Sequence, residues 1–171
     1  MRGVVRDVAV LLLATVMGIG VVLAMSVDAA RSATTPQCTN DDVTASYRGG
    51  DAAMSHVYGR IVLKNTSDRT CFIRGYGGLS YVGNGDGTQI GAAADRTSSK
   101  KPKTVLQPGD KVRSRVVETS YGPYPKKKCK PRAVDGFRVY IPDEDRSQFI
   151  PHATTGCANT DIHLLAHKAY R

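Results

Sequence analysis

The chain has 171 residues and a formal net charge of +9 at pH 7. The part that follows an uncharged N-terminal run has the size of one domain, which excludes an assembly of several domains. The whole excess of positive charge belongs to that domain, because the arginines and aspartates before residue 30 cancel. Such a domain is attracted to anionic surfaces, although solubility alone would also account for the charge.

Residues 1–29 are predicted to direct export. Arg2 and Arg6 provide a positively charged start, and residues 8–27 contain no charged side chain. A secretory hydrophobic core spans about 7–15 residues and a membrane helix about 20, so the run fits either a signal peptide or a retained membrane anchor. Small residues at its end favour cleavage. Both alternatives place the following domain outside the cytoplasm, either secreted or in the cell envelope.

Residues 30–37 are predicted to be a linker, and residues 38–171 a single disulfide-bonded domain. All the cysteines lie in this domain, at Cys38, Cys71, Cys129 and Cys157. An even number of cysteines in an exported domain predicts two disulfides, and three pairings are possible. Order along the chain favours joining the first to the second and the third to the fourth. A zinc site is the alternative, but no two cysteines have the C-x-x-C spacing typical of zinc ligands.

The first predicted strands surround the turn formers of residues 65–68. Residues 43–47 are a plausible first strand, and residues 56–64 alternate between polar and apolar side chains. That alternation is typical of a strand with one buried face. Residues 70–74 would return from the turn as a second strand that carries Cys71. The pattern therefore predicts a β-hairpin between residues 56–64 and 70–74.

Further strands follow at intervals set by glycine, proline and asparagine. They are predicted at residues 79–82, 88–91, 104–106, 111–119, 137–141 and 161–167. In the fourth of these, Val112 and Val116 would point inward while Arg113 and Arg115 point outward. Residues 92–103 and 143–156 are predicted to be exposed loops. About eight short antiparallel strands and two disulfides predict an all-β fold, a β-sandwich of immunoglobulin-like or related type.

A resemblance to a known family emerges from these motifs. The chain has Asn-Thr-Ser before Thr-Cys at residues 65–71, Leu-Gln-Pro-Gly at residues 106–109, and late cysteines around the Phe137 strand. It resembles an actinobacterial family of secreted and lipid-anchored β-domains, the domain-of-unknown-function family 4232. The resemblance covers roughly residues 38–169, although Gly77 replaces the usual proline and no lipobox is present. It implies a sandwich-like fold, and it assigns no activity and no catalytic residue.

Two histidines near the end of the chain suggest a metal site. His163 and His167 would share one face of the last predicted strand, with Asp161 beside them. Three such side chains can bind a divalent metal, and a metal-dependent hydrolase is therefore one alternative function. We favour an exposed strand face instead, because the spacing supplies no third histidine and no supporting shell of ligands.

The most basic segment of the sequence is a second candidate site. It contains Lys126, Lys127, Lys128, Lys130 and Arg132, with two tyrosines nearby. Cations mixed with aromatic rings can bind a polyanion or nucleic acid. The simpler interpretation is a solvated basic loop beside Cys129, because runs of charge usually lie on the surface.

The sequence therefore predicts a non-catalytic exported domain that binds a cell-envelope component or another protein. Polyanion or nucleic-acid binding through residues 126–132 is the second reading, and a hydrolase that uses His163 and His167 is the third. We expect no catalytic residue, no metal and no cofactor. The expected partner is an anionic envelope polymer or a protein rather than nucleic acid, with membrane contact only through residues 1–29.

Overall fold

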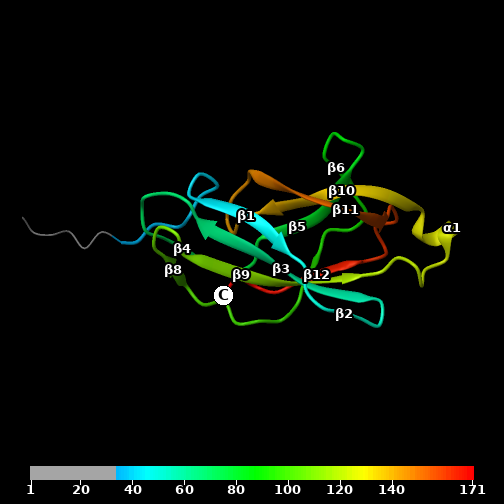
Figure 1. Cartoon of the computed structure of the whole chain (residues 1–171), viewed down its shortest axis with the longest axis horizontal. Coiled ribbons are helices and arrows are strands. Elements are labelled where there is room, and N and C mark those ends of the chain that lie inside the picture. The colour runs from blue at the N-terminus through cyan, green and yellow to red at the C-terminus, as the bar shows by residue number, and fades with distance from the viewer. Residues whose placement is uncertain (1–33) are drawn as a thin grey trace, which may run out of the picture. The chain divides into compact units, whose positions relative to one another are not determined.

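The computed structural model describes residues 34–171, so the predicted export segment at residues 1–29 lies outside the described residues. The described part is almost entirely β (Figure 1). Its one helix is a single turn, α1 (Lys126–Cys129). Within residues 34–171, no helix is long and apolar enough to cross a membrane.

Two sheets form the body of the domain, and a short strand pair lies beside them. The first sheet has the order β1 (Val43–Arg48), β3 (His56–Asn65), β9 (Lys111–Thr119), β12 (Leu165–His167) and β7 (Asp95–Arg96), and β2 (Ala52–Ala53) pairs with β3. The second sheet has the order β11 (Ser147–Cys157), β10 (Pro131–Tyr140), β5 (Gly78–Gly83) and β6 (Thr88–Ile90). The short pair joins β4 (Cys71–Ile73) to β8 (Thr104–Leu106). Except for the parallel β7–β12 pair, the strands pair antiparallel, as the sequence predicted.

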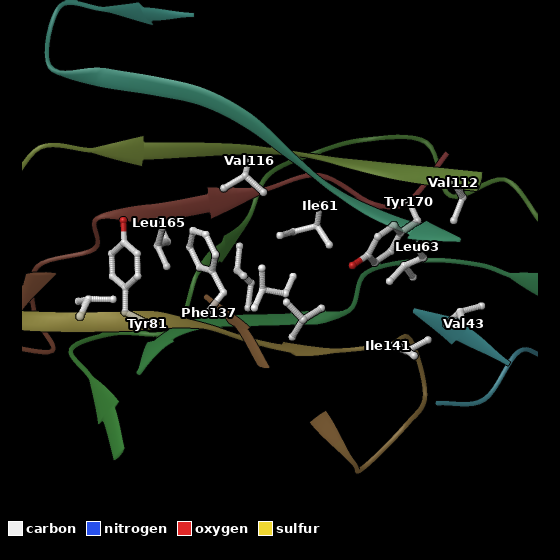
Figure 2. Close-up of a cluster of buried hydrophobic side chains, with 14 of the residues drawn as sticks. Val43, Ile61, Leu63, Tyr81, Val112, Val116, Phe137, Ile141, Leu165 and Tyr170 are labelled. Atoms are coloured by element: carbon white, nitrogen blue, oxygen red, sulfur yellow. The ribbon is translucent and has the colours of Figure 1, made fainter. Parts of the chain in front are cut away.

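The core lies between the two sheets. Ile61, Val116 and Leu165 come from the first sheet and point toward Tyr81 and Phe137 of the second (Figure 2). Each large apolar side chain that is fully buried in this way stabilises the fold by about 1.5–3 kcal/mol. The predicted alternation of β9 is confirmed, because its even-numbered residues are buried and its arginines are exposed. The sandwich thus follows from alternating strands that bury one face.

The predicted hairpin between residues 56–64 and 70–74 is wrong. β3 pairs with β1 and β9, while β4 pairs with β8. The turn between them leads the chain away from β3, because Asn65 donates hydrogen bonds to the carbonyls of Arg69 and Leu106. Asp42 also binds the Arg69 guanidinium through both carboxylate oxygens. These contacts tie the turn to other segments, so it does not close a local hairpin.

The prediction of a loop over residues 143–156 is also wrong. β11 occupies most of this segment and pairs with β10 along its length. The strand contains Pro151, and a proline is tolerated there because β11 lies at the edge of its sheet. The register shifts between Val134 and Gly136 of β10, and Gly136 lies opposite Pro151. A bulge therefore accommodates the proline.

Both predicted disulfides are confirmed. Cys38 is bonded to Cys71 and Cys129 to Cys157, and the described residues contain no free cysteine. The partners are separated by 33 and 28 residues in the sequence. The first bond fastens the start of the domain to β4, and the second joins α1 to the end of β11. Two disulfides indicate that the domain folds in an oxidising compartment.

The edges of the two sheets meet at β1 and β11, and one glutamine joins them. The Gln148 side chain accepts a hydrogen bond from the Ala45 backbone N–H, at 2.8 Å. Its amide group donates to the Val43 carbonyl at 2.7 Å and to the Asn40 side chain at 3.1 Å. The side chain thus takes the place of a neighbouring strand along this part of β1.

Candidate functional site

The predicted basic segment lies at one end of the domain (Figure 1). Lys126, Lys127 and Lys128 are exposed on α1, and Arg132 is exposed at the start of β10. Lys130 has a positive φ of 51° and ends the helical turn. These cations surround a disulfide-bonded turn, and the structure gathers no aromatic ring over them. Residues 126–132 therefore remain a predicted polyanion site with no further support.

A larger group of cations covers the outer side of the first sheet. We call it the cationic face, and it comprises Arg48, Arg60, Lys64, Lys111, Arg113, Arg115, Lys168 and Arg171. All are exposed except Lys168, which is half-buried. Within residues 34–171, none of these side chains forms a hydrogen bond or an ion pair with another part of the domain. The face therefore presents positive charge that no acidic side chain of the described residues neutralises by contact.

The strand register places like charges opposite one another on this face. Arg60 lies between Arg48 on β1 and Arg115 on β9, and Lys64 lies opposite Lys111. Like charges directly opposite on neighbouring strands lower stability by roughly 0.2–1 kcal/mol a pair. A sheet face maintained only for solubility would be more stable with charges of alternating sign.

Sequence reasoning identified parts of this face but not the whole. The outward parity of Arg113 and Arg115 was predicted correctly, and Arg60 and Lys64 also share one parity of β3. Their alignment depends on the pairing of β3 with β9, which the sequence analysis did not predict. The signal that could have found the face is the repeated occurrence of cations at outward positions of separate strands.

The two histidines of the predicted metal site do not share a strand face. His163 precedes β12, is exposed, and binds the Asp95 carboxylate with 2.7 Å between Nδ1 and Oδ1. His167 is buried, and its Nδ1 lies 3.4 Å from Ser114 Oγ. His167 lies on the buried side of β12 together with Leu165, so the exposed strand face that the sequence favoured is wrong for this residue. No group of residues within 34–171 is arranged to hold a metal ion.

A buried carboxylate that the sequence analysis missed bridges the two sheets. Glu118 on β9 accepts hydrogen bonds from Tyr47 of its own sheet and from Tyr81 of the other, the latter at 2.7 Å. The same oxygen lies 2.8 Å from Nε2 of His152 on β11. His152 in turn stacks on Phe137, with 4.5 Å between ring centroids. We call these groups the Glu118 cluster.

The hydrogen bonds of the cluster keep Glu118 ionised. Burial acts to raise the pKa of the Glu118 carboxyl, but hydrogen bonds from His152, Tyr47 and Tyr81 favour the anion, and the pKa lies below its usual value. Burial, together with Glu118, raises the pKa of both tyrosines. The three donors therefore bind the ionised form of the Glu118 carboxylate. Because these donors come from both sheets, the cluster connects the two sheets.

Acid is expected to destabilise the domain in two stages. Burial and the nearby charge of Arg96 lower the pKa of His167 from 6.5 to about 4 in the folded domain. The imidazole therefore binds a proton more tightly in the unfolded chain than in the folded domain. Stability should therefore fall by about 2 kcal/mol as the pH drops from 7 to about 5. Below about pH 4 the contribution of His167 is exhausted, but the loss should continue because Arg69 holds the pKa of Asp42 far below its usual value.

Urea unfolding at a series of pH values measures this dependence. His167→Gln should remove the first stage and leave the second. Asp42→Asn should weaken the second stage and leave the first. A free energy of unfolding that stays constant from pH 7 to pH 5 would contradict the account of His167.

The family to which the chain belongs follows from comparison of its sequence with family models. The model for a domain of unknown function, DUF4232, matches residues 38–166. This range contains both disulfides, the Glu118 cluster and all of the cationic face except Lys168 and Arg171. Comparison with curated proteins and with solved structures gives no significant match. The match covers more than half of the chain, and the chain is therefore a member of the DUF4232 family of domains of unknown function.

Proposed function

We propose that the chain is a non-catalytic exported domain that binds an anionic component of the cell envelope through the cationic face. The supporting observation is the row of like-charged pairs across β1, β3 and β9, none of which forms an ion pair within residues 34–171. An anionic ligand would relieve the repulsion between these pairs. Binding of such a ligand would therefore also stabilise the fold. The disulfides and the predicted export segment support a location outside the cytoplasm.

A binding role also fits the titratable groups in the interior. The carboxylate of Glu118 is buried and already accepts three hydrogen bonds, two of them from tyrosine hydroxyl groups. His167 is buried against the first sheet, and burial keeps it neutral at pH 7. The hydrogen bonds and the burial of these groups stabilise the fold. This role favours a binding domain over the alternative of a hydrolase.

Loss of charge from the cationic face should weaken binding more than the same loss elsewhere. The test variant carries Arg60→Gln, Arg113→Gln and Arg115→Gln, and the matched control carries glutamine at Lys126, Lys127 and Lys128. Both lose three positive charges from exposed positions. We expect the first variant to bind isolated bacterial cell envelopes at least tenfold more weakly, a loss of about 1.4 kcal/mol. The control should change by less than threefold.

Co-sedimentation of the full chain with the envelopes at several salt concentrations provides the measurement. Wild-type binding should weaken as salt rises, and the slope should be shallower for the face variant, which has fewer cations to contribute. Equal losses in the two variants would show that net charge alone drives binding. A larger loss in the control would instead move the site to residues 126–132.

A further inference from the structure

The cationic face is hollowed on both sides of its centre. One hollow, of about 590 Å³, is lined by Lys111, Arg60 and Arg113 among others. A second, of about 660 Å³, is lined by Arg115, Arg171 and again by Arg60 and Arg113. Arg60 and Arg113 line both hollows, so the two hollows adjoin at these arginines, and we call the adjoining pair the groove. A groove of this form suits a chain-like ligand better than a flat surface.

The spacing of the cations along the groove is regular. Lys111, Arg113 and Arg115 are successive outward residues of β9. Outward residues of a strand are about 6.5–7 Å apart, and the neighbouring strand runs about 4.8 Å away. β3 adds a second row, because Lys64 lies opposite Lys111 and Arg60 opposite Arg115. A linear polymer with one negative charge in each repeat of similar length would meet a cation at every repeat.

The kind of cation at each position indicates the kind of anion. The centre of the groove carries arginines, and the lysine pair stands at one end. An arginine fork binds two oxygens of one phosphate group, and its geometry is fixed by the planar guanidinium. Val62 follows Arg60 among the outward residues of β3, lies opposite Arg113 and is nonetheless buried, so the surrounding side chains cover it. Their stems are thereby held against the sheet, with the charged ends directed to solvent.

We propose that the cationic face binds a linear phosphodiester polymer, which lies along β9 with successive phosphates against Lys111, Arg113 and Arg115. This inference rests on the proposed function and names the ligand class of the same site. An extended phosphodiester backbone has one charge in each repeat, and it can enter both hollows. The plane of headgroups of a lipid bilayer meets only the rim of a groove. A polymer is therefore the favoured source of the phosphate groups.

The test compares ligands of different length, anionic group and shape. The probes are glycerol phosphate oligomers of one, three, six and ten units, polyglutamate of matched charge, and vesicles that contain phosphatidylglycerol. Calorimetric titration of the full chain should show affinity that rises about a hundredfold from the single unit to the six-unit oligomer. The gain should then level off, because the longer oligomer extends beyond the groove. Polyglutamate should bind at least tenfold more weakly than the oligomer of equal charge.

Single substitutions locate the ligand on the face. Arg113→Gln, at the centre of the groove, should weaken binding of the six-unit oligomer at least tenfold. Lys126→Gln, which removes one charge from α1, should leave that affinity within twofold of wild type. Thermal unfolding without ligand serves as the folding control. Arg113→Gln should leave the melting temperature unchanged or raise it, because the substitution removes one charge from a face of like charges.

The outcomes separate the two levels of the proposal. If vesicles or polyglutamate bind as tightly as the oligomers, the phosphodiester assignment fails while the proposed function stands. If affinity does not depend on oligomer length, the path along β9 is wrong. If no anionic probe and no envelope preparation binds, both the inference and the proposed function fail.

Discussion

Replacing Glu118 with alanine should lower the free energy of unfolding by about 3–5 kcal/mol. The loss arises because Tyr47, Tyr81 and His152 would all lose the carboxylate that they bind. Each buried donor left without an acceptor costs about 1–3 kcal/mol. The connection between the two sheets at this end of the core would also be lost.

Urea unfolding of Glu118→Ala tests this result, with two comparison variants. Asp145→Ala removes an exposed carboxylate of the second half of the chain and should change stability by less than about 0.5 kcal/mol. Glu118→Gln keeps the shape and one acceptor oxygen, so it should lie between alanine and wild type. Should Glu118→Ala unfold at the same urea concentration as Asp145→Ala, the cluster would contribute nothing to stability.

Loss of the disulfide between Cys38 and Cys71 should cost about 3–4 kcal/mol. The bond closes a loop of 33 residues, and a crosslink of that length removes a large number of conformations from the unfolded chain. Both side chains are buried in the native domain, so alanine at these positions also leaves apolar space unfilled. The double variant Cys38→Ala, Cys71→Ala therefore avoids free thiols while it removes the bond.

Thermal unfolding with and without a reductant provides the measurement. The double variant should melt well below wild type, and reductant should lower its melting temperature further by breaking the bond between Cys129 and Cys157. A variant in which that second pair is replaced should show a similar loss, because its loop of 28 residues is nearly as long. Wild-type stability in the first variant would contradict the chain-entropy explanation.

Strands that alternate clearly could be predicted from the sequence. β9 is the best example, since Val112, Val116 and the exposed arginines follow the two-residue period without interruption. β11 was missed because residues 143–156 are polar, and this edge strand buries few of its side chains. The local signal of a turn at residues 65–68 was real, but a turn does not specify which strand pairs with which.

The candidate site was harder to predict than the strands. The cations at Arg60 and Arg115 are 55 positions apart in the sequence numbering, and only strand pairing brings them together. Pairing over such a distance is decided by the packing of the whole core rather than by local propensity. Glu118 was more accessible to prediction, because it continues the inward parity of Val112 and Val116. A carboxylate at an inward position indicates a buried polar cluster.

The glutamine that joins β1 to β11 has a consequence for how the protein behaves at high concentration. An open strand edge exposes N–H and C=O groups to which a second molecule can add its own strand, and such additions lead to aggregates. At the β1 edge, the Ala45 N–H and the Val43 carbonyl are already bonded to Gln148. One side chain thereby blocks β-augmentation at this edge, so the domain can reach a high concentration without polymerising through β1.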